Sequence, residues 1–268
     1  DKSKYILKQN FYTSKDGTRI SIFIAHDKDL VLDNMRPTLL YGYGGFNITK
    51  KPYFNKTLPV LFENGGVYAL ANIRGGGEYG QEWHEAGMLD KKQNVFDDFI
   101  AAGEFLITEG YTSPERLAIR GGSNGGTLIG AVINQKPNLF RVAFPEVGVM
   151  DMLRYEKFTI GWAWAVEYGS VKNKKDCENL LTYSPLHNVK EQTYPSVLVY
   201  TADHDDRVVP AHSFKYAARL QNHQTSDDPI LIRIGSSTGH GAGRPTKMKI
   251  KEYAEKWAFM FYEMGVDI

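Results

Sequence analysis

A serine set among glycines is the residue whose surroundings best fit covalent chemistry. Ser123 lies in the run GGSNGG, residues 121–126, which contains the spacing G-x-S-x-G. Residues 117–120 alternate like a short buried strand, and apolar residues recur at helical spacing over 128–132. Strand, glycine-rich turn and helix predict a nucleophile elbow, whose tight turn projects the serine hydroxyl. The alternative is a glycine-rich turn that binds phosphate or only packs tightly.

A serine hydroxyl needs a general base, and the base needs an orienting acid. In hydrolases with this elbow the acid and then the histidine follow the serine, after later strands. His240 lies between the last predicted strand, 230–234, and the final predicted helix, so it occupies the expected place of the base. No other histidine fits this order, and the alternative for His240 is a solvated loop histidine.

The acid is expected after the predicted strand 197–201. Asp203, Asp205 and Asp206 all follow that strand, and the pattern alone leaves the choice among these three aspartates open. The two that are not the acid would cap the next helix or pair with Arg207.

An oxyanion hole requires hydrogen-bond donors beside the serine. The backbone N–H of Asn124, directly after Ser123, is the first candidate donor. The phenol of Tyr43, which follows the predicted strand 37–41, is the second candidate, and simple packing of this tyrosine on its glycine loop is the alternative.

These residues need a frame that brings them together. Residues 10–25 predict a β-hairpin, and further strands are predicted at 37–41, 66–71, 117–120, 142–145, 197–200 and 230–234. Helical patterns lie between or after them, at 95–107, 128–132, 214–220 and 250–264. Alternating strands and helices indicate an α/β-hydrolase fold with a mostly parallel, doubly wound eight-stranded sheet, an antiparallel N-terminal hairpin and one domain over 1–268. Reactive loops should then meet at the carboxyl ends of the strands.

Composition and charge give no support for nucleic-acid or membrane binding. The net charge is +1 and the pI about 7.9, so nothing indicates nucleic acid or an anionic membrane as a partner. Cys177 is the single cysteine and cannot form an internal disulfide, which leaves a cytoplasmic or a periplasmic location open. The sequence holds no apolar run of about 18 residues and no apparent targeting signal, and we expect no metal or cofactor.

Six motifs together resemble the prolyl oligopeptidase family of serine peptidases. They are YGYGGF (41–46), RGGGEYG (74–80), GGSNGG (121–126), VGVMDML (147–153), ADHDDRVVP (202–210) and GHGAG (239–243). The resemblance implies Ser123, Asp205 and His240 as the catalytic triad, with Tyr43 and the Asn124 amide as the oxyanion hole. It selects Asp205 because the family's acid stands two residues before an arginine, here Arg207.

The resemblance also implies a pocket that accepts proline and a substrate carbonyl held by Arg207. The residues matching that pocket are Phe46, Val149, Trp164, Tyr168 and Val208. Trp162 is an equally good aromatic on composition alone, so the choice of Trp164 depends on the resemblance.

The implied activity is hydrolysis of short peptides on the carboxyl side of proline, through an acyl-enzyme. A dipeptidyl- or acylaminoacyl-peptidase and a non-catalytic binding module of the same fold are the alternatives. Members of the family carry a β-propeller before this region, and a short N-terminal stretch that packs on the catalytic domain. We find neither in this sequence, and we expect an exposed apolar face where those parts would sit.

Overall fold

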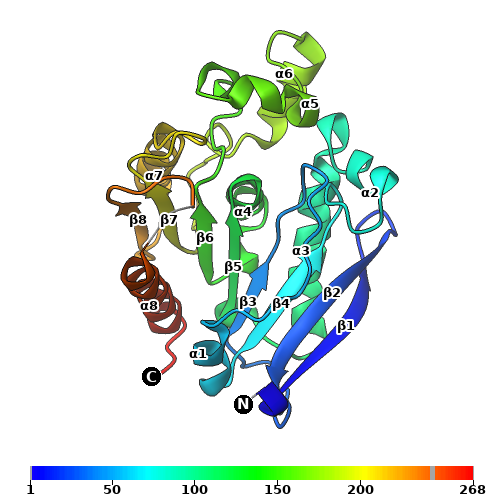
Figure 1. Ribbon diagram of the computed structural model, residues 1–268, viewed down its shortest axis with the longest axis vertical. Coiled ribbons are helices and arrows are strands. Elements are labelled where there is room, and N and C mark those ends of the chain that lie inside the picture. The colour runs from blue at the N-terminus through cyan, green and yellow to red at the C-terminus, as the bar shows by residue number, and fades with distance from the viewer. Residues whose placement is uncertain (1, 242–244, 268) are drawn as a thin grey trace.

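The computed structural model describes residues 2–241 and 245–267 and is built around one twisted eight-stranded sheet (Figure 1). The strand order is β1-β2-β4-β3-β5-β6-β7-β8. The strands are β1 Tyr5–Thr13, β2 Arg19–Asp27, β3 Thr38–Tyr41, β4 Val67–Asn72, β5 Leu117–Gly122, β6 Val142–Glu146, β7 Ser196–Ala202 and β8 Ile230–Gly235. The β1–β2 and β2–β4 pairs are antiparallel, and all others are parallel. This confirms the predicted α/β-hydrolase sheet, with a hairpin that is longer than residues 10–25.

Helices cover both faces of this sheet. The α-helices are α1 Leu58–Glu63, α2 Gln81–Glu85, α3 Gln93–Thr108, α4 Asn124–Gln135, α5 Ala165–Tyr168, α6 Lys174–Tyr183, α7 Ala211–His223 and α8 Thr246–Glu263. The core on one face is built with α3, α4 and α7, and the core on the other with α1 and α8. Within the described residues, no helix is both long and apolar enough to cross a membrane.

The two cores follow from the alternation of side chains along each strand. On β3, Leu39 packs toward α1 and α8, whereas Leu40 packs toward α3 and α4. On β5, Ala118 and Ile119 divide in the same way. Each central strand is therefore buried on both faces, which is why these strands read as nearly continuous apolar runs.

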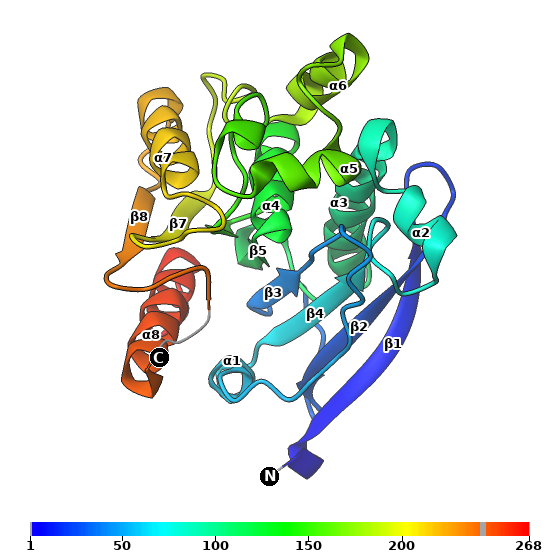
Figure 2. The same cartoon turned by 45° about the horizontal axis from the view of Figure 1, so that its top comes forward.

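The parallel strands bring four distant loops to one edge of the sheet. Tyr43 follows β3, Ser123 follows β5, Asp205 follows β7 and His240 follows β8. These carboxyl ends lie toward the top of Figure 1, beneath α5 and α6, and Figure 2 turns this edge toward the reader. The parallel sheet therefore gathers these residues at the edge where folds of this kind place reactive groups.

Candidate active site

Ser123 lies at a strained turn between β5 and α4. Its backbone has φ 59° and ψ −121°, a left-handed conformation that is costly for a residue with a side chain. The glycines around it are sterically required, since a Cβ at Gly121 would lie 2.3 Å from the Gly125 carbonyl oxygen. One at Gly126 would lie 2.5 Å from the carbonyl oxygen of Glu146. The local geometry is thus that of a nucleophile elbow.

His240 stands between Ser123 and Asp205. Its Nε2 lies 3.1 Å from Ser123 Oγ, and its Nδ1 lies 2.7 Å from Asp205 Oδ2. In the tautomer that this arrangement favours, Nδ1–H donates to the carboxylate and leaves Nε2 free to accept the serine proton. The motif GHGAG ends in Ala242 and Gly243, which lie outside the described residues.

Among the three aspartates that the sequence left open, Asp205 is the one that contacts His240. Its side chain is fully buried, and its Oδ1 accepts hydrogen bonds from the backbone N–H groups of Arg207 and Val208, at 3.0 and 2.9 Å. Asp203 instead contacts His204 and accepts hydrogen bonds from the Ser237 and Thr238 amides.

The surroundings of Asp203 also keep its carboxylate ionised at neutral pH. The hydrogen bond with His204, together with the Ser237 amide, lowers the pKa of Asp203 to about 2. Asp203 therefore braces the loop that carries His240, without contacting the imidazole of that histidine.

Two candidate hydrogen-bond donors lie beside Ser123. Asn124 is the first residue of α4, so its backbone N–H has no carbonyl partner within the helix. Burial raises the pKa of the Tyr43 phenol, and a side-chain hydrogen bond with Ser123 opposes this shift. The phenol is therefore protonated at neutral pH and is close to the serine, as a donor to an oxyanion must be.

Asn124 has a second contact set that the sequence did not indicate. Its Nδ2 donates to the backbone carbonyl of Tyr43, and its Oδ1 accepts a hydrogen bond from the Tyr168 phenol at 2.8 Å. The only signal in the sequence was a polar residue on the buried first turn of α4. Its side chain joins two residues that were selected separately as oxyanion and pocket residues.

The residues matched to the proline pocket belong to, or pack against, the same apolar core beside α4. Phe46 meets the ring of Tyr168 edge-on, with centroids 5.5 Å apart, and Tyr168 meets Tyr155 in the same manner. Trp164 stacks on Tyr155 at 6.4 Å, whereas the Trp162 residue is 67% exposed. The aromatic cluster therefore contains Trp164 rather than Trp162.

The other three matched residues surround this cluster. Val149 and Val208 are buried, and the backbone of Val149 exchanges hydrogen bonds with the Thr127 hydroxyl on α4. Arg207 is exposed, and its charge acts to lower the pKa of Tyr43.

A cavity of about 460 Å³ opens beside Ser123 and His240. Its wall includes Arg120 and Glu146, which share two hydrogen bonds, and Glu146 also forms an ion pair of 2.6 Å with Lys256. Burial acts to raise the pKa of Glu146, but these two cations outweigh it and lower the pKa to about 2. Among the described residues, no group of three or more His, Cys, Asp or Glu side chains is arranged to hold a metal ion.

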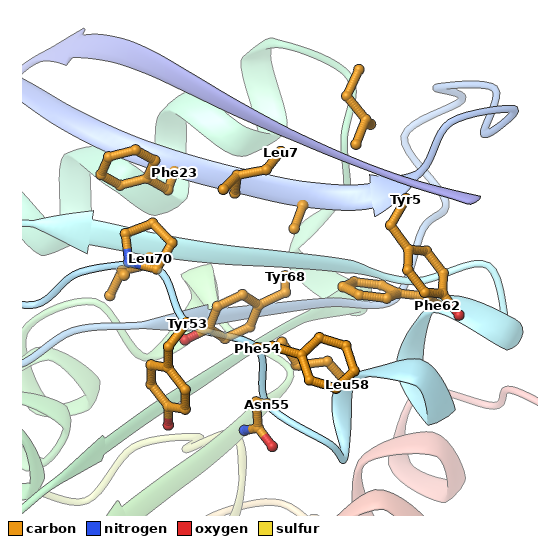
Figure 3. A pocket seen from close by; sticks show the side chains of 13 residues that line it. Tyr5, Leu7, Phe23, Tyr53, Phe54, Asn55, Leu58, Phe62, Tyr68 and Leu70 are labelled. Atoms are coloured by element: carbon orange, nitrogen blue, oxygen red, sulfur yellow. The ribbon is translucent and has the colours of Figure 1, made fainter. Parts of the chain in front are cut away.

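A second cavity, of about 320 Å³, lies away from Ser123 against β1, β2 and β4 (Figure 3). Aromatic and aliphatic side chains dominate it, and Tyr53, Phe54 and Leu7 remain largely exposed there. The described residues thus include an exposed apolar face. That a propeller or an N-terminal stretch packs on this face stays a prediction.

An α/β-hydrolase sheet with a serine, a histidine and an aspartate in contact at its carboxyl edge defines the class of serine hydrolases of this fold. Comparisons with known proteins narrow the class. Residues 52–267 match the model of the prolyl oligopeptidase family. The chain therefore belongs to this family, which confirms the resemblance carried by its motifs.

Prolyl endopeptidases and related solved structures align with nearly all of this chain. A prolyl endopeptidase of Elizabethkingia meningoseptica is 55% identical over 264 residues, covering 98% of this chain and 37% of the relative. A solved structure from a study of two prolyl endopeptidases has a TM-score of 0.98 at 46% identity, covering all of this chain and 40% of the other. A post-proline cleaving enzyme of Rickettsia typhi has a TM-score of 0.94 at 38% identity, covering 100% and 39%. The chain thus spans little more than a third of the length of these relatives.

Proposed function

We propose that this chain carries the peptidase domain of a serine endopeptidase that cleaves short peptides on the carboxyl side of proline. The observation that supports the proposal most directly is the hydrogen-bonded chain Ser123–His240–Asp205, at 3.1 and 2.7 Å. The names of the relatives supply the substrate class, since a prolyl endopeptidase is 55% identical to this chain over 98% of the chain.

In the proposed acylation step, Ser123 Oγ attacks the carbonyl carbon that follows the proline ring, and its proton passes to His240 Nε2. The Asn124 N–H and the Tyr43 phenol donate to the resulting oxyanion. The carbon–nitrogen bond then breaks, and His240 returns the proton to the leaving amine. Asp205 holds the imidazole in the required tautomer and stabilises its charged form.

In the deacylation step, a water molecule gives a proton to His240 and attacks the ester carbon. The bond to Ser123 Oγ then breaks, His240 returns the proton to Oγ, and the peptide leaves as a carboxylic acid that loses its own proton to solvent. The side chains of Phe46, Trp164 and Tyr168 would offer flat apolar surfaces to the proline ring. In this proposal Val149 and Val208 complete the pocket, and Arg207 holds a substrate carbonyl.

We also propose that a β-propeller partners this domain in the longer protein. The supporting facts are the coverage of 37% of a named relative and the exposed apolar side chains Leu7, Tyr53 and Phe54. A propeller of this kind would restrict entry to short peptides.

The activity is tested with a peptide that is blocked at its amino end and carries Gly-Pro before a chromogenic amide. The proposal predicts release of the chromophore by the full-length protein, and slower release by residues 1–268 alone. Cleavage only of substrates with a free amino end would instead indicate a dipeptidyl-peptidase. Absence of both cleavage and fluorophosphonate labelling would indicate a non-catalytic module.

A further inference from the structure

Two buried side chains hold successive carbonyl groups of the loop that carries Tyr43. The carbonyl of Tyr43 accepts a hydrogen bond from Asn124 Nδ2. The next carbonyl, that of Gly44, accepts one from Lys92 Nζ at 3.0 Å. Gly44 has φ 61°, and a Cβ there would lie 2.4 Å from Val95, so the loop is closely packed at this point.

The same two side chains also reach successive residues at the end of α5. Asn124 Oδ1 accepts a hydrogen bond from the Tyr168 phenol, at 2.8 Å. Lys92 Nζ donates to Glu167 Oε1, at 3.3 Å. Two parallel bridges therefore join residues 43–44 to residues 167–168, one through Asn124 and the other through Lys92.

The Lys92 bridge is an expensive arrangement. The side chain of Lys92 is only 2% exposed, and burial lowers its pKa while Glu167 acts in the opposite direction. Glu167 is equally buried, and its other oxygen lies 2.7 Å from His84 Nε2. A methionine of similar volume would pack here without any charge to desolvate. What methionine lacks is a donor for the Gly44 carbonyl.

We propose that Lys92 is a positioning residue that fixes the Tyr43 phenol by holding the Gly44 carbonyl against α5. This inference rests on the proposed function, because it concerns where a donor to the oxyanion stands. Lys92 would not touch the substrate. It acts through the loop 42–48, whose displacement by a fraction of an ångström weakens a hydrogen bond that must be aligned in the transition state.

Lys92→Met keeps the volume of the side chain and removes its donor. In the full-length protein, we expect kcat on a blocked prolyl substrate to fall roughly tenfold or more, with KM little changed. Amide hydrogen exchange of residues 42–48 should become faster. Arg141→Met is the matched control. Arg141 directly precedes β6 and forms ion pairs with Asp228 and Glu263, so its replacement should leave exchange in the loop 42–48 unchanged.

A stability defect can be separated from a positioning defect. Lys92→Met leaves Glu167 without one of its partners, whereas Lys92→Met combined with Glu167→Met removes both buried charges. The double variant should regain stability, while kcat stays low and exchange of the loop stays fast. Recovery of kcat together with stability would reduce Lys92 to a counter-ion for Glu167 and overturn the proposal.

The route through Tyr43 is tested by repeating Lys92→Met in a Tyr43→Phe background. Without the phenol there is no donor to misplace, so the further loss in kcat should be much smaller than in wild type. Equal fold-losses in both backgrounds would contradict the proposal. If the wild-type protein neither turns over nor labels at Ser123, the proposed function fails. Amide exchange then still tests whether Lys92 holds the loop 42–48, since unchanged exchange of this loop in Lys92→Met would overturn the proposal.

Discussion

Asp205 Oδ2 lies 2.7 Å from His240 Nδ1, while the other oxygen of the same carboxylate accepts two backbone N–H groups. The Asp205 carboxylate is thus held in orientation both by its own loop and by the imidazole. Because both oxygens are used, the carboxylate has little freedom to turn away from His240. The neighbouring Asp203 carboxylate is held by the loop of residues 237–238 instead.

This relationship predicts a sharp difference among the three aspartates. Asp205→Ala should lower kcat by about 10⁴, as loss of a triad acid does in other serine hydrolases. Asp203→Ala should cost far less, and its main effect should be looser order around His240. Asp206→Ala should be close to wild type. Steady-state kinetics on one substrate decide the matter, and an inactive Asp203→Ala beside an active Asp205→Ala would contradict the assignment.

The Tyr43 phenol is predicted to act in the transition state. Tyr43→Phe removes one hydroxyl and keeps the ring, so kcat should fall by roughly 10²–10³ with KM little changed. The measurement needs a substrate whose chemical step limits the rate. A kcat near wild type would mean that the tyrosine is only packed against its loop.

The Glu146 ion pairs predict a pH dependence of stability. The pKa of Glu146 is lowered from its usual 4.5 to about 2, so the folded protein binds this proton less readily than the unfolded chain. The stabilisation is therefore complete above about pH 4.5 and is lost as the pH falls toward 2. Glu146→Gln should cost about 3–5 kcal/mol at neutral pH, because Arg120 and Lys256 lose a buried partner.

Urea unfolding of wild type and Glu146→Gln at pH 3, 4 and 7 checks this prediction. The difference in the free energy of unfolding should shrink as the pH falls. A difference that is the same at every pH would show that Glu146 contributes through packing rather than through charge.

Specificity for proline is predicted to depend on Trp164. Its indole stacks on Tyr155 within the aromatic cluster, and Trp164→Ala should cost proline substrates roughly 1–3 kcal/mol in kcat/KM. Substrates with alanine at the same position touch the indole less and should lose less. The ratio of kcat/KM for proline over alanine substrates isolates this effect from a general loss of stability.

Trp162→Ala is the matched control, since Trp162 is two residues away and largely exposed. It should keep the wild-type ratio. A folded Trp164→Ala variant that also keeps this ratio would remove Trp164 from the pocket.

How much the sequence could predict depends on which physical signal each feature leaves. The sheet was predictable because its central strands are apolar on both faces. The positions of Ser123 after β5 and of His240 after β8 were predictable because their places between strands are distinctive, while their catalytic roles stay predictions. The helices α1 and α2 were not predicted, since they have only 6 and 5 residues and no clear periodicity. The helix α6 was not predicted either, because it lies outside the layers that pack on the sheet and is mostly polar (Figure 1).

Other features required three-dimensional contacts. Asp203, Asp205 and Asp206 are chemically identical, and only the loop conformation places one beside His240. The two tryptophans at 162 and 164 differ in burial rather than in type. The burial of Lys92 could not be predicted from the sequence because a lysine is normally exposed, and its partners Gly44 and Glu167 are far away along the chain.

Fluorophosphonate labelling of Ser123, measured beside turnover of the blocked prolyl substrate, decides whether Ser123 is the nucleophile. Wild-type protein should label at Ser123, and Ser123→Ala should lose both labelling and turnover while its thermal unfolding stays near wild type. Covalent labelling or prolyl cleavage that persists in a folded Ser123→Ala variant would show that Ser123 is not the nucleophile.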